Sequence, residues 1–106
     1  MINSKVYGLI GLAMRAGKIA FGADSVEDLI KKRKLKLVIV AEDSSDRTKN
    51  NFEFICNKNN IPIIIYGTIE NISKSIGKQN KAIIGVKEAN IANEICKIVN
   101  GGEIIG

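Results

Sequence analysis

Hydrophobic residues recur along the chain at two different spacings, which predict helices and strands in turn. Val26, Leu29 and Ile30 lie at the spacing of one helix face, with acidic residues in the opening turn and basic residues at the close. Residues 37–41 form a continuous apolar run that is too short to favour a helix and has no polar alternation. A strand covered on both faces fits this run best.

The same reasoning, applied to the whole chain, predicts strands that alternate with helices. Helices are expected at 4–16, 23–33, 46–59, 69–76 and 88–99, and strands at 18–21, 36–41, 63–66 and 82–86. Because no internal repeat or linker interrupts the alternation, it indicates an α/β fold, a three-layer α/β/α sandwich. We expect one domain over residues 1–100 and a flexible tail at 101–106.

Single residues add expectations about particular helices. Gly8 and Gly11 interrupt the first helix and cost about 1 kcal/mol each relative to alanine, so close packing against another backbone is expected to compensate. Thr68 is expected to cap the short helix at 69–76 and Gly77 to end it. Asn60 is expected to end the preceding helix in a left-handed conformation.

Composition favours a polyanionic partner. The chain has 106 residues, with 16 basic and 11 acidic side chains, a formal net charge of +5 and an isoelectric point near 9.3. This balance favours nucleic acid over an acidic protein or a cationic ligand. Most cations are lysines, which suit point contacts to phosphate better than bidentate reading of guanine edges. Recognition of shape is therefore expected rather than readout of sequence.

The two cysteines predict no metal or redox site. Cys56 and Cys96 lie far apart, without CxxC spacing, in a chain that has no histidine. Each shares a helical stripe with apolar neighbours, so we expect core thiols and neither a zinc site nor another cofactor. No apolar run is long enough to span a membrane, and no targeting segment is evident, which predicts a cytoplasmic protein without a membrane partner.

Several short motifs, taken in order, resemble one known family. They are LIGLAMRAGK at 9–18, Gly22 with Val26, the AED of 41–43 followed by Thr48-Lys49, the Asn60-Ile61-Pro62 step and SIGK at 75–78. The chain resembles the kink-turn RNA-binding ribosomal proteins of the L-seven-Ae type, and within them the small bacterial YlxQ-type branch. The resemblance implies a mixed four-stranded sheet, a non-catalytic RNA-binding role and association with ribosomal or other structured RNA.

The resemblance also implies one RNA-facing element at the turn after the first strand. In the family, a glycine, an Asn-Glu pair and a lysine three residues on occupy positions that here read Gly22, Asp24, Ser25 and Asp28. A helix start pushed towards RNA offers free backbone N–H groups, and nearby side chains reach base edges. Asp28 departs from the pattern, because an anion near a phosphate is repulsive. The acids also suit a helix that is only capped and solvated.

The second element implied by the resemblance is the loop at 76–82. Gly77 allows a tight turn, lysines supply charge, two amide side chains supply donors and acceptors, and Ile76 is expected to pack on an unstacked base. In the predicted fold, strand ends bring this loop beside Gly22 and Asp43. An ordinary polar loop is the alternative.

The densest basic cluster, at 31–36, is open to two interpretations. It suits a solvated helix end, and it equally suits a salt-sensitive, sequence-independent RNA contact. Because it lies at the far end of its helix from Gly22, it could serve only a large RNA that wraps around the protein. A ribosomal RNA would qualify.

An enzyme is the least favoured hypothesis. Glu42 and Asp43 are adjacent on a strand and therefore point to opposite faces, so they do not face one substrate together. Asp43 is expected instead to accept backbone hydrogen bonds in the turn before Thr48. Without histidine, no Cys/His or Ser/His pairing exists, and no glycine-rich phosphate loop follows a strand.

We therefore predict a non-catalytic RNA-binding protein that acts as a monomer. Its predicted partners are structured, kink-turn-like RNA, with ribosomal RNA as a candidate, and a ribosomal or translation-related protein. The predicted RNA-binding residues are Lys18, Gly22, Ala23, Asp24, Ser25, Asp28, Lys31, Lys32, Ile76, Gly77, Lys78, Gln79, Asn80 and Lys81. The alternative is a protein-interaction module in which the acids of the helix at 23–33 contact a basic protein.

Overall fold

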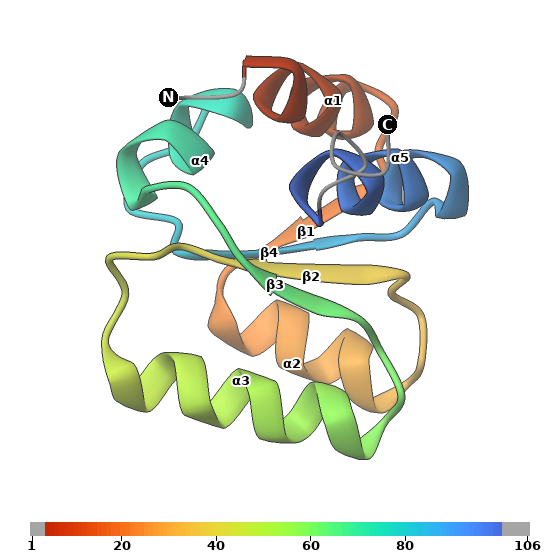
Figure 1. Cartoon of the computed structure of the whole chain (residues 1–106), viewed down its shortest axis with the longest axis vertical. Coiled ribbons are helices and arrows are strands. Elements are labelled where there is room, and N and C mark those ends of the chain that lie inside the picture. Colours follow the sequence, from red (N-terminus) through yellow and green to blue (C-terminus); the bar gives the residue numbers. More distant parts are fainter. Residues whose placement is uncertain (1–3, 101–106) are drawn as a thin grey trace.

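A mixed four-stranded sheet lies between two layers of helices in a computed structural model that describes residues 4–100 (Figure 1). The elements are α1 (Ser4–Arg15), β1 (Ile19–Phe21), α2 (Ala23–Lys31), β2 (Leu37–Val40), α3 (Asp46–Lys58), β3 (Ile63–Ile65), α4 (Ile69–Ser75), β4 (Ile83–Val86) and α5 (Ala89–Val99). The strand order is β1-β4-β2-β3, with β4 antiparallel to both neighbours and β2 parallel to β3. The predicted sandwich is confirmed. The tail expected at 101–106 lies outside the described residues.

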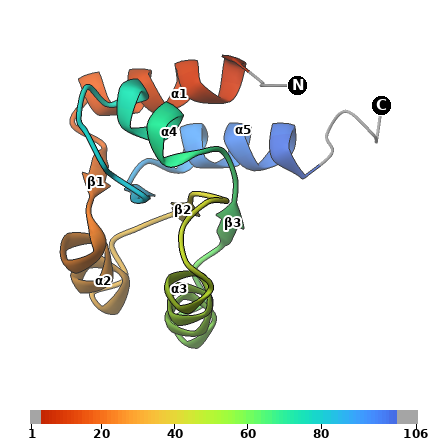
Figure 2. The same ribbon diagram turned by 90° about the vertical axis from the view of Figure 1, so that its left-hand side faces the viewer.

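Both faces of the sheet are covered, by α1, α4 and α5 on one side and by α2 and α3 on the other (Figure 2). Side chains of β2 alternate between the two cores. Leu37 and Ile39 pack towards α1, α4 and α5, whereas Val38 and Val40 pack towards α2 and α3. All four are fully buried, and burial of each side chain stabilises the fold by about 1.5–3 kcal/mol. This double cover explains why the run has no polar alternation.

Helix ends follow local chemistry as predicted. The Thr68 side chain accepts a 3.1 Å hydrogen bond from the backbone N–H of Asn71 and so caps α4. Asn60 has a φ of 57° just beyond α3, and Gly77 has a φ of 69° beyond α4. Both residues occupy the left-handed region in which helices commonly end.

The two glycines inside α1 behave differently. A β-carbon on Gly11 would lie 3.2 Å from the backbone oxygen of Ser75, so this glycine allows α1 to approach α4 closely. A β-carbon on Gly8 would meet nothing within 4 Å, and the residue is exposed. The expectation of close backbone packing is confirmed for Gly11 and wrong for Gly8, because Gly8 lies on the outward side of the helix.

The cysteines lie in or against the core, as expected. Cys56 is buried with Phe52 in the core between the sheet and α2 and α3, and burial raises its thiol pKa to about 11. Cys96 is half-buried against the other core, and burial also raises its pKa. Within residues 4–100, no helix is both long enough and apolar enough to cross a bilayer.

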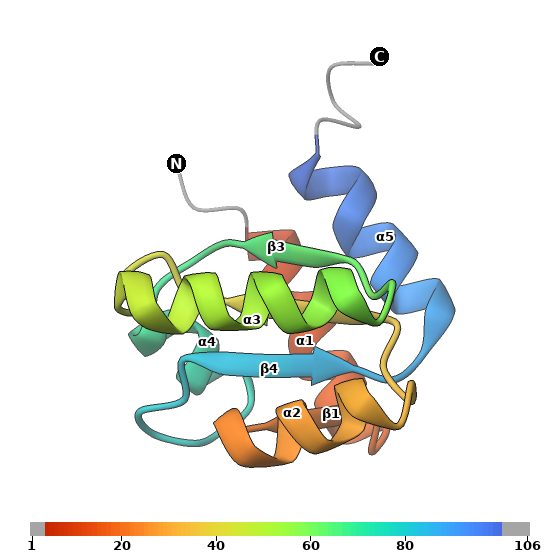
Figure 3. The same ribbon diagram turned by 90° about the horizontal axis from the view of Figure 1, so that it is seen from below.

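The direction of the elements gives the sandwich two distinct ends. Helices α2 and α3 run side by side in the same direction, and β4 runs beside them towards the ends of both helices (Figure 3). Because β4 is antiparallel to β1 and β2, the ends of β1 and β2 and the start of β4 lie together at one end of the sheet. The starts of α2 and α3 therefore lie there too.

Candidate nucleic-acid interface

Three segments far apart in the sequence meet at this end of the sheet, and we call residues 22–25, 43–45 and 77–81 the rim. The backbone N–H of Gly22 donates a 3.0 Å hydrogen bond to the oxygen of Ile83, which joins the start of α2 to the start of β4, just after the 77–81 segment. A surface depression of about 500 Å³ is lined by all three segments, including Gly22, Asp43 and Lys81. The predicted convergence of the loop with Gly22 and Asp43 is confirmed.

The start of α2 is open to solvent. Gly22, at its N-cap, has a φ of 91° and a ψ of 149°, and within the described chain no side chain caps the helix. A β-carbon on Gly22 would meet nothing within 4 Å, so the glycine is required by backbone conformation rather than by crowding. Ala23, Asp24 and Ser25 are exposed. The first backbone N–H groups of the helix thus face outward, where an anion is favoured.

The ring of Phe21 contacts both lysines of the 77–81 segment. The ammonium nitrogens of Lys78 and Lys81 lie 5.2 and 5.6 Å from the centre of its ring. Each such cation–π contact is worth about 0.5–1 kcal/mol at an exposed site. Sequence reasoning missed Phe21. The available signal was its position: it is an aromatic residue at the end of one predicted strand, and a loop with two lysines leads into another strand of the same sheet. Its register partner is Ile84 of β4.

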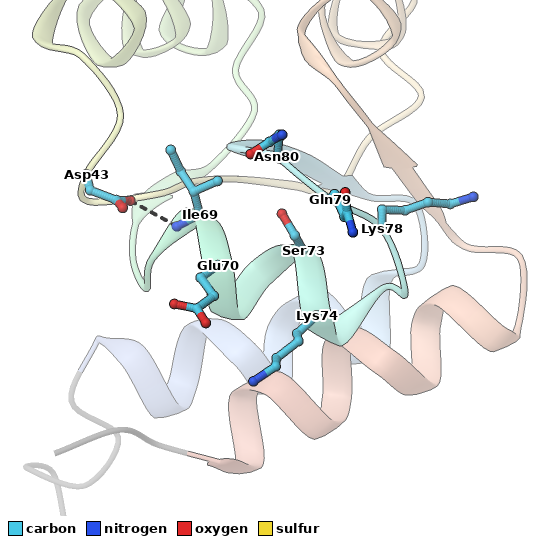
Figure 4. Close-up of a pocket in the computed structure, with 8 residues that line it drawn as sticks. All are labelled: Asp43, Ile69, Glu70, Ser73, Lys74, Lys78, Gln79 and Asn80. Atoms are coloured by element: carbon cyan, nitrogen blue, oxygen red, sulfur yellow. Dashed lines mark hydrogen bonds between the residues drawn. The ribbon is translucent and has the colours of Figure 1, made fainter.

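A buried serine on α4 fixes the backbone of the same segment through hydrogen bonds. Ser73 is 3% exposed, and its hydroxyl oxygen accepts a 2.7 Å hydrogen bond from the backbone N–H of Lys81. Its backbone oxygen accepts a 2.9 Å bond from the N–H of Lys78. Figure 4 shows Ser73 beneath the segment, with the Lys78 side chain pointing to the side opposite Asp43. Sequence reasoning missed Ser73, whose position beside Ile72 on the inward stripe of α4 was the available signal.

Asp43 has a different role from the predicted one. Its carboxylate accepts a 2.9 Å hydrogen bond from the backbone N–H of Ile69, the first residue of α4 (Figure 4). The expected bond within the turn before Thr48 is wrong, because the Ser45 side chain accepts the N–H of Thr48 instead. Asp43 therefore joins the end of β2 to α4, which carries the 77–81 segment.

Ile76 does not belong to the interface. It is 4% exposed and packs in the core between the sheet and the layer of α1, α4 and α5. The expectation that it packs on an unstacked base is wrong, because it continues the apolar stripe of α4 and faces inward. Beyond it, Gly77, Lys78, Gln79 and Asn80 are exposed and Lys81 is half-buried.

Three predicted lysines lie at the other end of the sandwich. Lys18 precedes β1, and its backbone oxygen accepts a 2.8 Å bond from Lys87 beyond the end of β4. Lys31 and Lys32 close α2 and form 3.0 Å ion pairs with Glu27 and Asp28. The structure therefore separates Lys18, Lys31 and Lys32 from the rim. Asp28 lies one turn inside α2, exposed, with its charge directed to Lys32.

Comparisons with known proteins agree with this architecture. Residues 4–96 match the family described as ribosomal protein L7Ae/L30e/S12e/Gadd45. The chain is 31% identical to the RNA-binding protein YlxQ of Bacillus subtilis (strain 168) over 103 residues, which cover 94% of this chain and 100% of that protein. It is 32% identical to the RNA-binding protein YlxQ of Enterococcus faecium over 99 residues, which cover 93% and 95% of the two chains.

Solved structures share the fold. A protein of unknown function from Bacillus halodurans aligns with a TM-score of 0.88 and 28% identity, over 92% of this chain and 99% of that one. A 15.5 kD RNA-binding protein of Giardia lamblia aligns with a TM-score of 0.78 over 94% and 92% of the two chains, at 17% identity, and shows likeness of fold alone. The chain belongs to the ribosomal protein L7Ae/L30e/S12e/Gadd45 family.

Proposed function

We propose that this protein is a non-catalytic RNA-binding protein that uses the rim to recognise structured, kink-turn-like RNA and associates with the ribosome. The observation that carries the proposal is the meeting of an uncapped helix start at Gly22 with the lysine-bearing segment at 77–81. Membership of the family and the names of the two YlxQ relatives support RNA as the partner.

The rim offers the groups that recognition of RNA shape requires. The open N–H groups at the start of α2 and the ammonium groups of Lys78 and Lys81 bind phosphate oxygens. The exposed side chains of Gln79 and Asn80 donate and accept hydrogen bonds to ribose or to base edges. Phe21 is half-buried beneath two cations and is not free to stack on a base. A folded RNA therefore suits this surface better than an unstructured single strand.

The alternative, a protein-interaction module that uses the acids of α2, has weaker support. Glu27 and Asp28 are engaged in ion pairs with lysines of the same helix. Of the three acids of α2, Asp24 is the one that forms neither of these ion pairs. A single exposed carboxylate is a small basis for binding a basic protein, since an exposed ion pair is worth about 0–1 kcal/mol.

The test is a binding titration with a kink-turn hairpin RNA as the probe. Replacing Lys78 and Lys81 together by alanine is expected to weaken binding by about tenfold and to reduce its salt dependence. Lys5→Ala with Lys97→Ala serves as the matched control, because both lysines lie beside Glu94 on the α1 and α5 side of the sheet. An unchanged dissociation constant in the Lys78 and Lys81 variant would rule out the rim as the site.

A further inference from the structure

Positive charge gathers at the end of the sandwich opposite the rim. We call the basic end the set Lys18, Arg33, Lys34, Lys36 and Lys87, all exposed. Backbone pairing brings its members together: the N–H of Lys36 donates to Val86 at 2.8 Å, and the N–H of Lys87 donates to Lys18 at 2.8 Å. The five residues therefore flank the starts of β1 and β2, the end of β4 and the end of α2, which lie at the same end of the sandwich (Figure 3).

Four of the five charges of the basic end are available to a partner, whereas the charge of Lys18 interacts with the carboxylate of Glu88. In the part of the chain that the structure describes, Arg33, Lys34, Lys36 and Lys87 form no ion pair. Glu88 is the acidic residue next to Lys87. Its carboxylate accepts the N–H groups of α5, at 3.0 and 2.7 Å, and thereby caps that helix. A strong local excess of positive charge remains.

The rim, by contrast, has no excess of positive charge. Its cations are Lys78 and Lys81, its anions are Asp24 and Asp43, and Asp28 lies one turn further along α2. The chain as a whole carries a net charge of +5. Long-range attraction of a polyanion follows the net charge of a surface, so most of the electrostatic attraction must originate at the basic end.

We propose that the basic end is a second RNA-binding surface, which holds the phosphate backbone of a duplex segment while the rim holds another segment of the same folded RNA. The proposal extends the proposed function to the class of RNA. Helix α2 has nine residues and separates the two surfaces by about 14 Å of helix, and the molecule measures 33 × 29 × 28 Å. A partner that reaches both ends is a large folded RNA rather than a small hairpin.

The composition of the basic end favours RNA over a membrane surface. Four of its five side chains are lysines, which bind phosphate as point charges without reading sequence. Binding to a membrane surface is strengthened by apolar side chains that insert beside the cations. The exposed large hydrophobic residues of the described chain, Leu12 and Phe54, belong to α1 and α3 and not to this set.

The test uses an RNA duplex of arbitrary sequence without any kinked loop, so that the rim is not required. Replacing Lys34, Lys36 and Lys87 by glutamine is expected to weaken duplex binding at least about tenfold and to lower the salt slope by about three. The control replaces Lys5, Lys49 and Lys97 by glutamine, which removes the same charge elsewhere; it is expected to stay within about twofold of the wild type. Circular dichroism verifies that both variants remain folded.

The outcomes separate this proposal from the proposed function. Equal losses in both variants, or no loss in either, would overturn the second surface. Tighter binding of the wild type to phosphatidylglycerol vesicles than to the duplex would also overturn it, in favour of a membrane surface. The Lys78 and Lys81 variant is expected to lose less affinity for the duplex than the Lys34, Lys36 and Lys87 variant does. If that variant also keeps its affinity for the kink-turn hairpin, the rim hypothesis fails while the basic end stands.

Discussion

The side chain of Leu35 fills the space beside Gly85 that a β-carbon would otherwise occupy. A β-carbon on Gly85, in the middle of β4, would lie 2.5 Å from the Leu35 Cδ1 atom and 2.9 Å from Cδ2. Leu35 is 4% exposed and packs in the core with Val38 and Ile30. The basic connection from α2 to β2 is therefore anchored to the sheet by one leucine among cations.

This contact predicts that Gly85→Ala is destabilising, although alanine is ordinarily more stable than glycine in the interior of a strand. Leu35 is buried, so it must repack within the core to make room for the new methyl group, and this overpacking is expected to lower the free energy of unfolding by about 1–3 kcal/mol. Urea denaturation measures this change. The double variant Gly85→Ala with Leu35→Ala is expected to lose less stability than the sum of the losses of the two single variants, because alanine at position 35 no longer meets the new methyl group. Full additivity would contradict the contact.

Ser73→Ala is expected to loosen the rim from below. The variant leaves the backbone N–H of Lys81 without its 2.7 Å acceptor in a partly buried site, at a cost of about 1–3 kcal/mol. Urea denaturation measures the loss of stability. In the same variant, binding of the kink-turn hairpin is expected to weaken, because the segment that presents Lys78 and Lys81 is no longer held in one conformation.

Ser75→Ala provides the control on the same helix. The Ser75 hydroxyl donates a 2.8 Å bond to the oxygen of Asn71 within α4 and holds no part of the rim. Its removal is expected to change the free energy of unfolding by less than about 0.5 kcal/mol and to leave RNA binding unchanged. Equal effects of the two serine variants on RNA binding would contradict a positioning role for Ser73.

The parts of the fold that local chemistry decides were predictable from the sequence. The β2 strand, the Thr68 cap and the left-handed Asn60 each follow from residues a few positions apart. The convergence of Gly22 with the 77–81 segment was also predictable, because strand ends of an α/β sheet gather ligand-facing loops.

Relationships that only the folded chain decides were not predictable from the sequence. Lys18 lies away from Gly22 because β1 is a three-residue strand that carries its two flanking residues to opposite ends of the sheet. Asp43 caps α4 across 26 positions of sequence, a partner that no local pattern indicates. Ile76 faces the core because the contact between α4 and the sheet sets which side of that helix is covered.

Three residues at the start of α2 differ from the family pattern, and restoring that pattern is expected to improve RNA binding. Changing Asp24 to Asn, Ser25 to Glu and Asp28 to Lys restores the family pattern and is expected to tighten kink-turn hairpin binding by about tenfold or more. Asp28→Lys removes the exposed ion pair with Lys32 and places two lysines four residues apart, and each of these effects costs stability about 0.2–0.5 kcal/mol. Isothermal titration calorimetry measures the affinity. An unaltered affinity in the folded variant would mean that the RNA does not approach α2 from its start.

Burial of Cys56 predicts a loss of stability in mildly alkaline solution. Burial raises the pKa of the Cys56 thiol from 9.0 to about 11, so the unfolded chain releases this proton at a lower pH than the folded chain does. The free energy of unfolding is therefore expected to be unaffected by this group below pH 9 and to fall as pH rises from 9 to about 11. Urea denaturation across this range measures the fall. Other groups also titrate there, so Cys56→Ala is the comparison: its stability is expected to fall less steeply over the same range, and an identical slope would show that the Cys56 thiol ionises as readily in the folded protein as in the unfolded one.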